Sequence, residues 1–395
     1  MIRDIQYGLK MLWKDRAYAV TAILTLAVCI GANTAIFTIV HSVLLKPLPV
    51  PDSDRILQMA NQYPNVGSVI SRPHSSVPDY YDRLLDMNVY EEQAMYETTS
   101  RVFYIDGSPE SIQGMEATPS FFRLLKVQPI QGRIFDESEG QAGNDSEVIL
   151  SYGLWQQRYG GDPDVIGRQI RMGGYPRAIV GVMPRSFQFV YPQTRFWIPL
   201  AFTDQQKSDD SRHQNSWINI GRLKPGATIQ QAQQQVNAIN AANLDRFPQY
   251  KQLLINAGFY SSVDRLQDVL VRNVRGVLYM LWGGAALVLL IGAANITNLA
   301  LARSNVRLKE ISTRLAIGAS RAQVAAQLIT ESLLLALIGG LFGILTGSSV
   351  LRALTTIGLD RLPRASEIHI SRLPLRRIAR TGIRRSRSSP GARKR

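Results

Sequence analysis

The sequence predicts a membrane protein with three transmembrane α-helices and an α+β domain outside the membrane. Three long segments contain no Lys, Arg, Asp or Glu: residues 17–45, 276–302 and 332–351. A bilayer core of about 30 Å requires about 20 apolar residues in a helix, so each segment is long enough to span it. Residues 46–277 alternate helix-like and strand-like patterns instead, which is typical of an α+β domain.

We place the transmembrane helices at residues 19–45, 278–302 and 324–351. A signal peptide is the alternative for the first, because basic residues precede it. A signal peptide has an apolar core of only about 7–15 residues before an A-x-A-type cleavage site. The charge-free stretch here has 29 residues, and no clear A-x-A motif follows it. We therefore favour a membrane-spanning helix.

Residues 1–18 have the pattern of an amphipathic helix in the membrane interface. Apolar residues recur at helical spacing, and the charged residues Arg3, Asp4, Lys10 and Lys14 occupy other positions. The apolar positions are Ile2, Ile5, Leu9, Leu12 and Trp13. The alternative is a frayed basic N-terminus.

The distribution of basic residues predicts the orientation in the membrane. Lys and Arg are concentrated in the N-terminal segment and in residues 303–323, between the second and third spans. Cytoplasmic segments carry such an excess of positive charge. We therefore expect the N-terminus and residues 303–323 in the cytoplasm and residues 46–277 outside.

The pattern within residues 46–277 predicts the individual elements of the outer domain. We expect helices over residues 79–87, 119–125 and 154–159, and strands over residues 146–150, 169–172, 178–182, 217–223 and 255–260. Thr228 is the expected N-cap of a further helix. The domain is expected to have two lobes. The only cysteine, Cys29, lies in the first span, so the outer domain has no disulfide.

Glycines in the third span predict close helix packing. Gly339, Gly343 and Gly347 recur every four residues and lie on one helical face. Small residues let helices approach closely in lipid, where packing drives association. The alternative is that glycine occurs there by chance.

Asn295, Thr297 and Asn298 lie near the inner end of the second span, and Glu331 lies in the first turns of the third. Ionisable groups in spans usually face protein or water. For Glu331 we favour a structural or interfacial role over a proton relay, because the pattern shows no basic partner for it.

Residues 303–323 form the predicted coupling loop. Arg307, Glu310 and Arg314 would form the charged face of a short helix parallel to the membrane. Gly318, Ala319 and Ser320 would break that helix, and Arg321 would begin the next one. Such a helix suits contact with a cytoplasmic motor. The alternative is a solvated connector.

Catalytic and metal-binding motifs are missing from the sequence. It has no G-x-x-x-x-G-K-[ST], no H-E-x-x-H and no G-x-S-x-G, and its four histidines are scattered. We therefore predict no catalytic, metal or cofactor site. Of the net charge of +15, ten positive charges in residues 371–395 leave +5 for residues 1–370, so nothing indicates nucleic acid as a partner.

Several stretches together resemble a known family. They include GLKMLWKDRAYAVTAILTLAVCIGANTAIFTIVHSVLLKPLP, VILSYGLWQQRYGGDPDVIGRQI, YPRAIVGVMPRSF, GRLKPGATIQQAQQQVNAI and ANITNLALARSNVRLKEISTRLAIGASRAQVAAQLITESLLLALIGG. Over about residues 1–370 the chain resembles MacB/FtsX-type ABC transporter permeases, in particular the duplicated branch abundant in acidobacteria.

The resemblance implies a MacB-like periplasmic core domain at residues 46–277 and the start of an FtsX-like permease domain in the third span. It implies location in the bacterial inner membrane and assembly as a homo- or heterodimer of permease halves. A separate ATPase would bind ATP and dock near residues 310–321. Clients among relatives include macrolides, peptides, lipoproteins and cell-wall hydrolases, and none can be chosen from the residues.

The chain departs from the family after about residue 370, within the predicted basic tail of residues 352–395. From Ser371 on, a tail rich in Arg, Ser, Pro and Gly replaces the expected apolar span. With three spans and a cytoplasmic N-terminus, this tail would lie outside, against the positive-inside rule. We expect a truncated or frameshifted first half. The alternative is a genuine basic tail that binds anionic lipid or wall polymer.

The leading functional hypothesis is a non-catalytic permease subunit that couples a cytoplasmic ATPase to the periplasmic domain for export or efflux. Two alternatives remain open. One is a membrane scaffold or signalling protein that binds a periplasmic partner. The other is a non-functional remnant. An anchored hydrolase is disfavoured by the missing catalytic motifs.

Overall fold

The computed structural model describes residues 12–13, 15–66, 74–105, 108–318 and 320–357. Two compact units make up the chain. The membrane unit holds the residues up to Ile39 and Ala285–Leu354, and the outer domain holds Val40–Gly284. Most of the predicted interfacial helix (residues 1–11 and 14) and most of the predicted tail (residues 358–395) lie outside the described residues.

Three long helices form the candidate membrane spans: α2 (Arg16–Val40), α9 (Leu266–Ala316) and α10 (Arg321–Ile357). A π-helical turn, η1 (His41–Leu45), continues α2. By length and composition the segments Arg16–Leu44, Leu266–Asn305 and Val324–Ala353 can each cross a membrane. The three predicted spans are therefore present.

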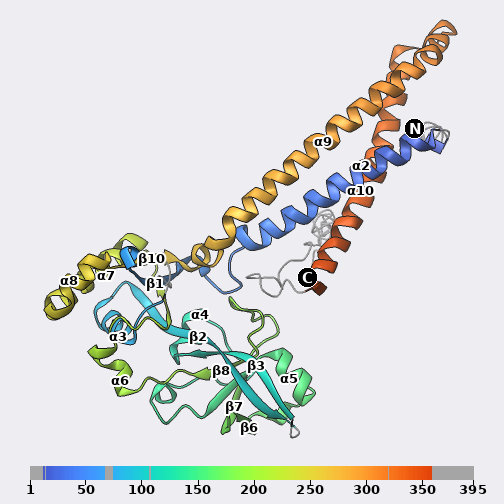
Figure 1. The fold of residues 1–395 in the computed structure, drawn as a ribbon. Coiled ribbons are helices and arrows are strands. Elements are labelled where there is room, and N and C mark those ends of the chain that lie inside the picture. Colours follow the sequence, from blue (N-terminus) through green and yellow to red (C-terminus); the bar gives the residue numbers. More distant parts are fainter. Residues whose placement is uncertain (1–11, 14, 67–73, 106–107, 319, 358–395) are drawn as a thin grey trace, which may run out of the picture. The chain divides into compact units, whose positions relative to one another are not determined.

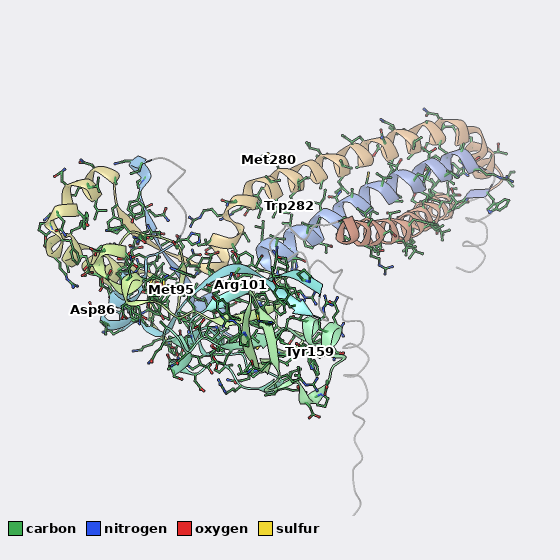
Figure 2. All side chains as sticks on the ribbon, turned by 60° about the horizontal axis from the view of Figure 1, so that its bottom comes forward. Asp86, Met95, Arg101, Tyr159, Met280 and Trp282 are labelled. Carbon is green, nitrogen blue, oxygen red and sulfur yellow. The ribbon has the colours of Figure 1, made fainter. Side chains whose placement is uncertain are left out.

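The spans expose apolar side chains, as helices surrounded by lipid do. Met280 and Trp282 on α9 are 75% and 52% exposed (Figure 2). Lipid tails are as apolar as these side chains, so burial against protein is not needed to remove them from water.

A ten-stranded sheet forms the centre of the outer domain (Figure 1). Its order is β10-β1-β9-β2-β3-β8-β5-β7-β4, and β6 pairs with both β2 and β7. The strands are β1 (Ile56–Gln62), β2 (Tyr90–Ile105), β3 (Ser108–Ala117), β4 (Gln131–Gly132), β5 (Glu147–Leu150), β6 (Gln169–Met172), β7 (Tyr175–Val182), β8 (Phe196–Pro199), β9 (Ile218–Leu223) and β10 (Tyr260–Arg265). The predicted strands at residues 146–150, 169–172, 178–182 and 217–223 are confirmed.

Short helices flank the sheet. They are α3 (Val77–Asp86), α4 (Ser120–Leu125), α5 (Tyr152–Tyr159), α6 (Asp204–Lys207), α7 (Ile229–Arg246) and α8 (Pro248–Ala257). Single 3-10 turns occur at η2 (Ser53–Arg55), η3 (Pro64–Val66), η4 (Glu137–Gly140), η5 (Pro163–Val165) and η6 (Asp209–Ser211). Thr228 caps α7 as predicted: its Oγ1 accepts from Gln231 N at 3.2 Å, and Gln231 Oε1 accepts from Thr228 N at 2.9 Å.

The predicted strand at residues 255–260 is wrong. Pro248 begins α8, where its fixed φ suits the first helical position. Gly258 ends the helix with φ +68°, a left-handed conformation that glycine adopts without strain. The strand β10 begins only at Tyr260. A short apolar run does not distinguish a helix from a strand, so periodicity alone misassigned it.

Several hydrophobic clusters of described residues lie along the sheet, and three of them mark its centre and its two ends. The central one packs Phe121 and Phe122 of α4 against Tyr96 of β2 and Trp197 of β8. A second cluster surrounds β1, β9, β10 and α7 at one end, and a third surrounds β5, β6, β7 and α5 near the other. The separate end clusters agree with the predicted two lobes, although one continuous sheet joins them.

A buried arginine organises the polar interior of the outer domain. Arg83 on α3 is 1% exposed. Its Nη1 donates to Ser75 Oγ at 2.7 Å and to Asn219 Oδ1 at 3.0 Å. Its Nη2 donates to Asn61 Oδ1 at 2.9 Å and to Ser261 Oγ at 3.1 Å. One guanidinium therefore joins α3 to three strands and to the segment before α3.

Asp79, one helical turn before Arg83, carries the balancing charge. Its carboxylate accepts hydrogen bonds from Asn61 at 2.6 Å and Arg212 at 3.0 Å. Burial by itself raises the pKa of Asp79, but the charge of Arg83 and the other positive and hydrogen-bonding partners outweigh burial, so the pKa lies below its usual value. The carboxylate is therefore ionised in the folded domain at neutral pH.

Candidate coupling site

The predicted coupling loop is largely a continuation of α9. The helix runs without interruption from Leu266 to Ala316, so the prediction of a separate short helix after residue 302 is wrong. No glycine or proline occurs from Ala293 to Ile317, so nothing in the sequence breaks the backbone hydrogen-bond ladder there. The true connection to α10 is the short segment 317–320.

Gly318 makes this connection possible. Its φ of +100° is accessible to glycine and strained for other residues. Its backbone N–H donates to Leu315 O at 3.2 Å and closes the last turn of α9. Ile317 beside it is 82% exposed, and α10 begins at Arg321, as predicted. Ala319 lies outside the described residues.

An ionic cluster joins the three long helices of the membrane unit at this end of α9. Arg307 Nη1 donates to Glu331 Oε2 on α10 at 2.8 Å. Arg303 Nη2 lies 3.3 Å from the same oxygen and 3.1 Å from Asp15 Oδ2, just before α2. Arg307 Nη2 lies 3.6 Å from Asp15 Oδ2. Two guanidinium groups thus balance two carboxylates.

Further contacts position this cluster. Gln327 Nε2 donates to the second oxygen of Glu331 at 3.2 Å. The guanidinium of Arg303 lies over the ring of Tyr18 on α2, 4.4 Å from its centroid. Glu331 is 2% exposed and Arg307 8%. Because both are buried, each depends on the other for its charge to be tolerated.

Two expectations about charged residues are corrected here. Arg307 was expected on the charged face of a short helix with Glu310 and Arg314, but its side chain is buried against Glu331. Glu331 was expected to lack a basic partner, but it has two. The side chains of Glu310 and Arg314 lie outside the description.

A sequence signal for the cluster existed in part. Arg303 and Arg307 are four residues apart, as are Gln327 and Glu331, so each pair shares a helical face. The sequence did not show that these faces meet, and it gave no reason to include Asp15.

The glycine face of α10 packs against α2. A Cβ placed on Gly339 would lie 2.6 Å from Leu26 Cβ, and one on Gly343 would lie 2.8 Å from Ile30 Cβ. One on Gly347 would lie 2.9 Å from the carbonyl oxygen of Gly31. The glycines therefore serve a contact between helices of the same chain.

Replacing Gly343 by valine is expected to force α2 and α10 apart. Overpacking of this kind costs about 1–3 kcal/mol. Gly340→Val is the matched control, because a Cβ there meets only Ile30 Cδ1 at 4.0 Å. Thermal unfolding of the chain in nanodiscs should show a lower melting temperature for Gly343→Val alone. Equal melting temperatures for the two variants would contradict the contact.

Asn295 and Asn298, by contrast, are exposed on α9. Asn295 borders a shallow depression of about 380 Å³ between α2 and α9. The amide that does join these helices is Asn33, which sequence reasoning missed. Its Nδ2 donates to Cys29 O at 2.9 Å in its own helix and to Ala285 O at 3.0 Å on α9. Such hydrogen bonds satisfy a polar side chain for which lipid tails offer no hydrogen-bond partner.

Within the described residues, no group of three or more His, Cys, Asp or Glu side chains is placed to hold a metal ion. In the membrane unit, the ionic cluster and the glycine face of α10 hold the three long helices together. This arrangement indicates a mechanical role.

Comparison with known families shows the family to which the chain belongs. The model of the MacB-like periplasmic core domain matches residues 19–239, more than half of the chain. The model of the FtsX-like permease C-terminal domain matches residues 282–371. The chain belongs to the MacB/FtsX-type permease family. The resemblance seen in the sequence is thereby confirmed, and this permease is a membrane protein of the ABC transporter permease class.

Curated relatives include the macrolide export ATP-binding/permease proteins MacB of Neisseria meningitidis serogroup A and Escherichia coli K12. The first is 27% identical over 227 residues, which is 56% of this chain and 32% of the relative. The second is 24% identical over 229 residues, which is 57% of this chain and 33% of the relative. The permease thus spans about a third of the length of these relatives.

Solved structures with a similar fold include a domain of a putative permease protein from Porphyromonas gingivalis. Its TM-score is 0.39 at 15% identity, and the match covers 55% of this chain and 93% of that one. The periplasmic region of MacB from Actinobacillus actinomycetemcomitans has a TM-score of 0.37 at 9% identity, covering 57% and 94%. The assignment to the family rests on the sequence matches.

Proposed function

We propose that this permease is a non-catalytic subunit that couples a separate cytoplasmic ATPase to motions of its extracytoplasmic domain during export. In this proposal ATP binds to the partner, and the permease supplies none of the hydrolytic chemistry. It acts in the bacterial inner membrane with its N-terminus in the cytoplasm, as one half of a dimer. The names of the MacB relatives support an export role without identifying the client.

The continuity of α9 carries this proposal. The helix is continuous over 51 residues. Its first residue, Leu266, is fully buried in the central cluster of the outer domain. Its other end, in the membrane unit, carries Arg303 and Arg307. A force applied near Ala316 would act on an unbroken hydrogen-bonded backbone that reaches Leu266.

The ionic cluster supports the same mechanism. Because it ties α9 to α10 and to the start of α2, a partner that moves one helix end would move the others with it. Like a packed interface, such a cluster changes between discrete arrangements rather than deforming continuously.

The exposed turn between α9 and α10 is the contact that we propose for the ATPase. Ile317 is 82% exposed there, and a large apolar side chain at a tip can fill a pocket of a partner. Replacing Ile317 by Asp is expected to reduce the amount of ATPase that co-purifies with the tagged permease at least about tenfold, as loss of an anchor residue does.

The matched control is Ile255→Asp, the same substitution at a residue on α8 of the outer domain that is 53% exposed. The measurement is vanadate-sensitive ATP hydrolysis in material purified from native membranes. The Ile255→Asp control should retain this ATP hydrolysis. Equal retention by both variants would reject the turn as the contact. No ATPase activity with the unaltered chain would reject the coupling function itself.

A further inference from the structure

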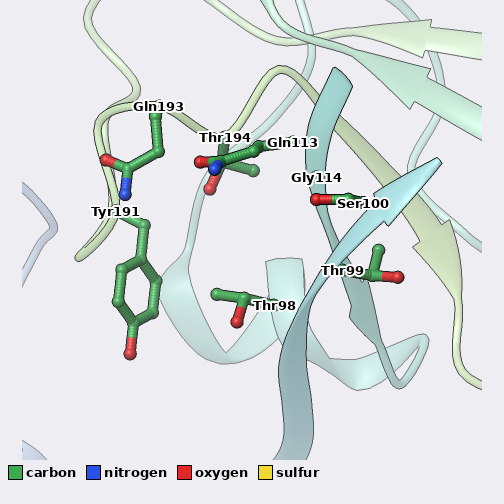
Figure 3. Close-up of a pocket in the computed structure, with 8 residues that line it drawn as sticks. All are labelled: Thr98, Thr99, Ser100, Gln113, Gly114, Tyr191, Gln193 and Thr194. Carbon is green, nitrogen blue, oxygen red and sulfur yellow. The ribbon is translucent and has the colours of Figure 1, made fainter. Parts of the chain in front are cut away.

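A polar groove crosses the β2–β3 hairpin of the outer domain. Its volume is about 270 Å³. It is lined by Thr98, Thr99 and Ser100 of β2, Gln113 and Gly114 of β3, and Tyr191, Gln193 and Thr194 of the segment before β8 (Figure 3). Neither the family matches nor the proposed coupling function explains it.

The chemistry of the lining is uniform. Among these eight described residues none is charged, and seven carry a hydroxyl or an amide. Burial, with Glu97 nearby, raises the pKa of Tyr191, so its phenol also stays neutral. Hydroxyls and amides both donate and accept hydrogen bonds. The groove therefore matches a ligand whose own groups both donate and accept hydrogen bonds.

Most of these polar groups are free to bind a ligand. The Thr98 hydroxyl donates to Glu97 Oε1 at 3.0 Å. Within the described part of the chain, the side chains of Gln113, Gln193 and Thr194 make no hydrogen bond to protein. Thr194 is nonetheless only 9% exposed. A polar group in a recess gains most from a ligand that replaces the water it would otherwise need.

Sheet pairing leaves the strand edge at this groove open. Among the described strands, β9 pairs with β2 only as far as Tyr96, and β6 pairs with it only from Phe103. The opening between them coincides with Thr98–Ser100 at the groove. On the opposite strand, Gly114 has no room for a side chain, because a Cβ there would lie 2.4 Å from the ring of Phe196.

From this geometry we infer that the groove binds a neutral saccharide through its hydroxyl and amide groups. The volume equals about nine water molecules at about 30 Å³ each, which suits one sugar ring and part of a second better than a peptide strand. The ring of Tyr191 offers an apolar face beside the polar groups, which a sugar ring also has. No lining residue is charged, and the neighbouring Glu97 is already engaged by His74 and Thr98, so a charged ligand would lose hydration without gaining a partner.

The test uses the complete chain in nanodiscs made from lipids without sugar headgroups. The neutral probes are N,N′-diacetylchitobiose and cellobiose, and the charged probes are glucosamine and glucuronate. Saturation-transfer NMR and calorimetry should show saturable binding of a neutral probe and at least about tenfold weaker binding of both charged ones, about 1.4 kcal/mol.

Gln113→Leu and Thr194→Val remove the binding groups with little change in size. Each is expected to weaken binding of the neutral probe about two- to tenfold, as the loss of one hydrogen bond does. Gln230→Leu is the matched control, because Gln230 is exposed on α7, away from the groove residues in the chain. Its affinity should equal that of the unaltered chain. Melting temperatures check that the variants fold.

Three results would overturn the inference. The first is no saturable binding of either neutral probe in the millimolar range. The second is equal affinity of the unaltered chain and both groove variants, which would place the sugar elsewhere. The third is tighter binding of an acetylated Thr-Val octapeptide than of the saccharides, which would make the open edge a site for strand addition. Because no ATPase is present, the outcome is independent of the coupling function.

Discussion

Replacing Arg83 by leucine is expected to lower the melting temperature of the outer domain by about 6–20 °C. The substitution removes the donor of four hydrogen bonds to side-chain acceptors, and it leaves Asp79 with Arg212 as its remaining buried cation. Removing one partner of a buried charged network costs about 3–5 kcal/mol. Each kcal/mol shifts the melting temperature of a domain of this size by about 2–4 °C. The measurement is intrinsic fluorescence of the full chain in nanodiscs during heating.

Arg246→Leu is the matched control. Arg246 is also on a helix and also near a carboxylate, with Nη2 3.3 Å from Asp209 Oδ2, but its side chain is 60% exposed. Exposed ion pairs contribute about 0–1 kcal/mol, so the control should shift the transition by less than about 4 °C. If the two variants had the same melting temperature, the network around Arg83 would not be the polar centre of the domain.

Replacing Glu331 by leucine is expected to destabilise the membrane unit by about 3–5 kcal/mol. The substitution leaves Arg303 and Arg307 with Asp15 as their remaining carboxylate in the cluster, so one buried and one largely buried cation share one anion. The loss should be visible as a lower melting temperature and as faster tryptic cleavage after Arg303 or Arg307 in nanodiscs. Arg307→Leu should have a similar effect, because it leaves Glu331 underpaired.

The double variant Arg307→Leu/Glu331→Leu distinguishes an ion pair from general packing. It removes one charge of each sign and keeps Arg303 beside Asp15, 3.1 Å apart. Replacing a buried pair by apolar residues is often neutral, so the double variant should be more stable than either single variant. A double variant whose loss equals the sum of the single losses would show no coupling between the two residues.

In the outer domain, the predictions that were right depended on local signals. Thr228 followed by Gln231 is a capping box whose hydrogen bonds lie within four residues, so the start of α7 was visible in the sequence. Residues 255–260 failed for the opposite reason. Their apolar side chains suit both a helix and a strand, and the outcome was decided by Pro248 and Gly258, which bound the helix α8.

The candidate site shows the same division. The basic residues of α9 and the position of Glu331 were recognised from the sequence, but their pairing was not. The two arginines, Arg303 and Arg307, lie on α9, and Glu331 lies on α10. Asp15 precedes Arg303 by 288 residues. The periodicity of residues within one helix does not specify which face of another helix it contacts.

The sequence by itself determined the three spans, the α+β class of the outer domain and the family. Spans follow from runs of apolar residues longer than a bilayer is thick, and the family follows from motifs spread along the chain. Only the tertiary structure decided the continuity of α9 through residues 303–316, the ion pairs of Glu331, the network of Arg83 and the polar groove at Thr98–Ser100. Each of these depends on which distant segments come within a few ångströms of one another, and that is set by packing rather than by local composition.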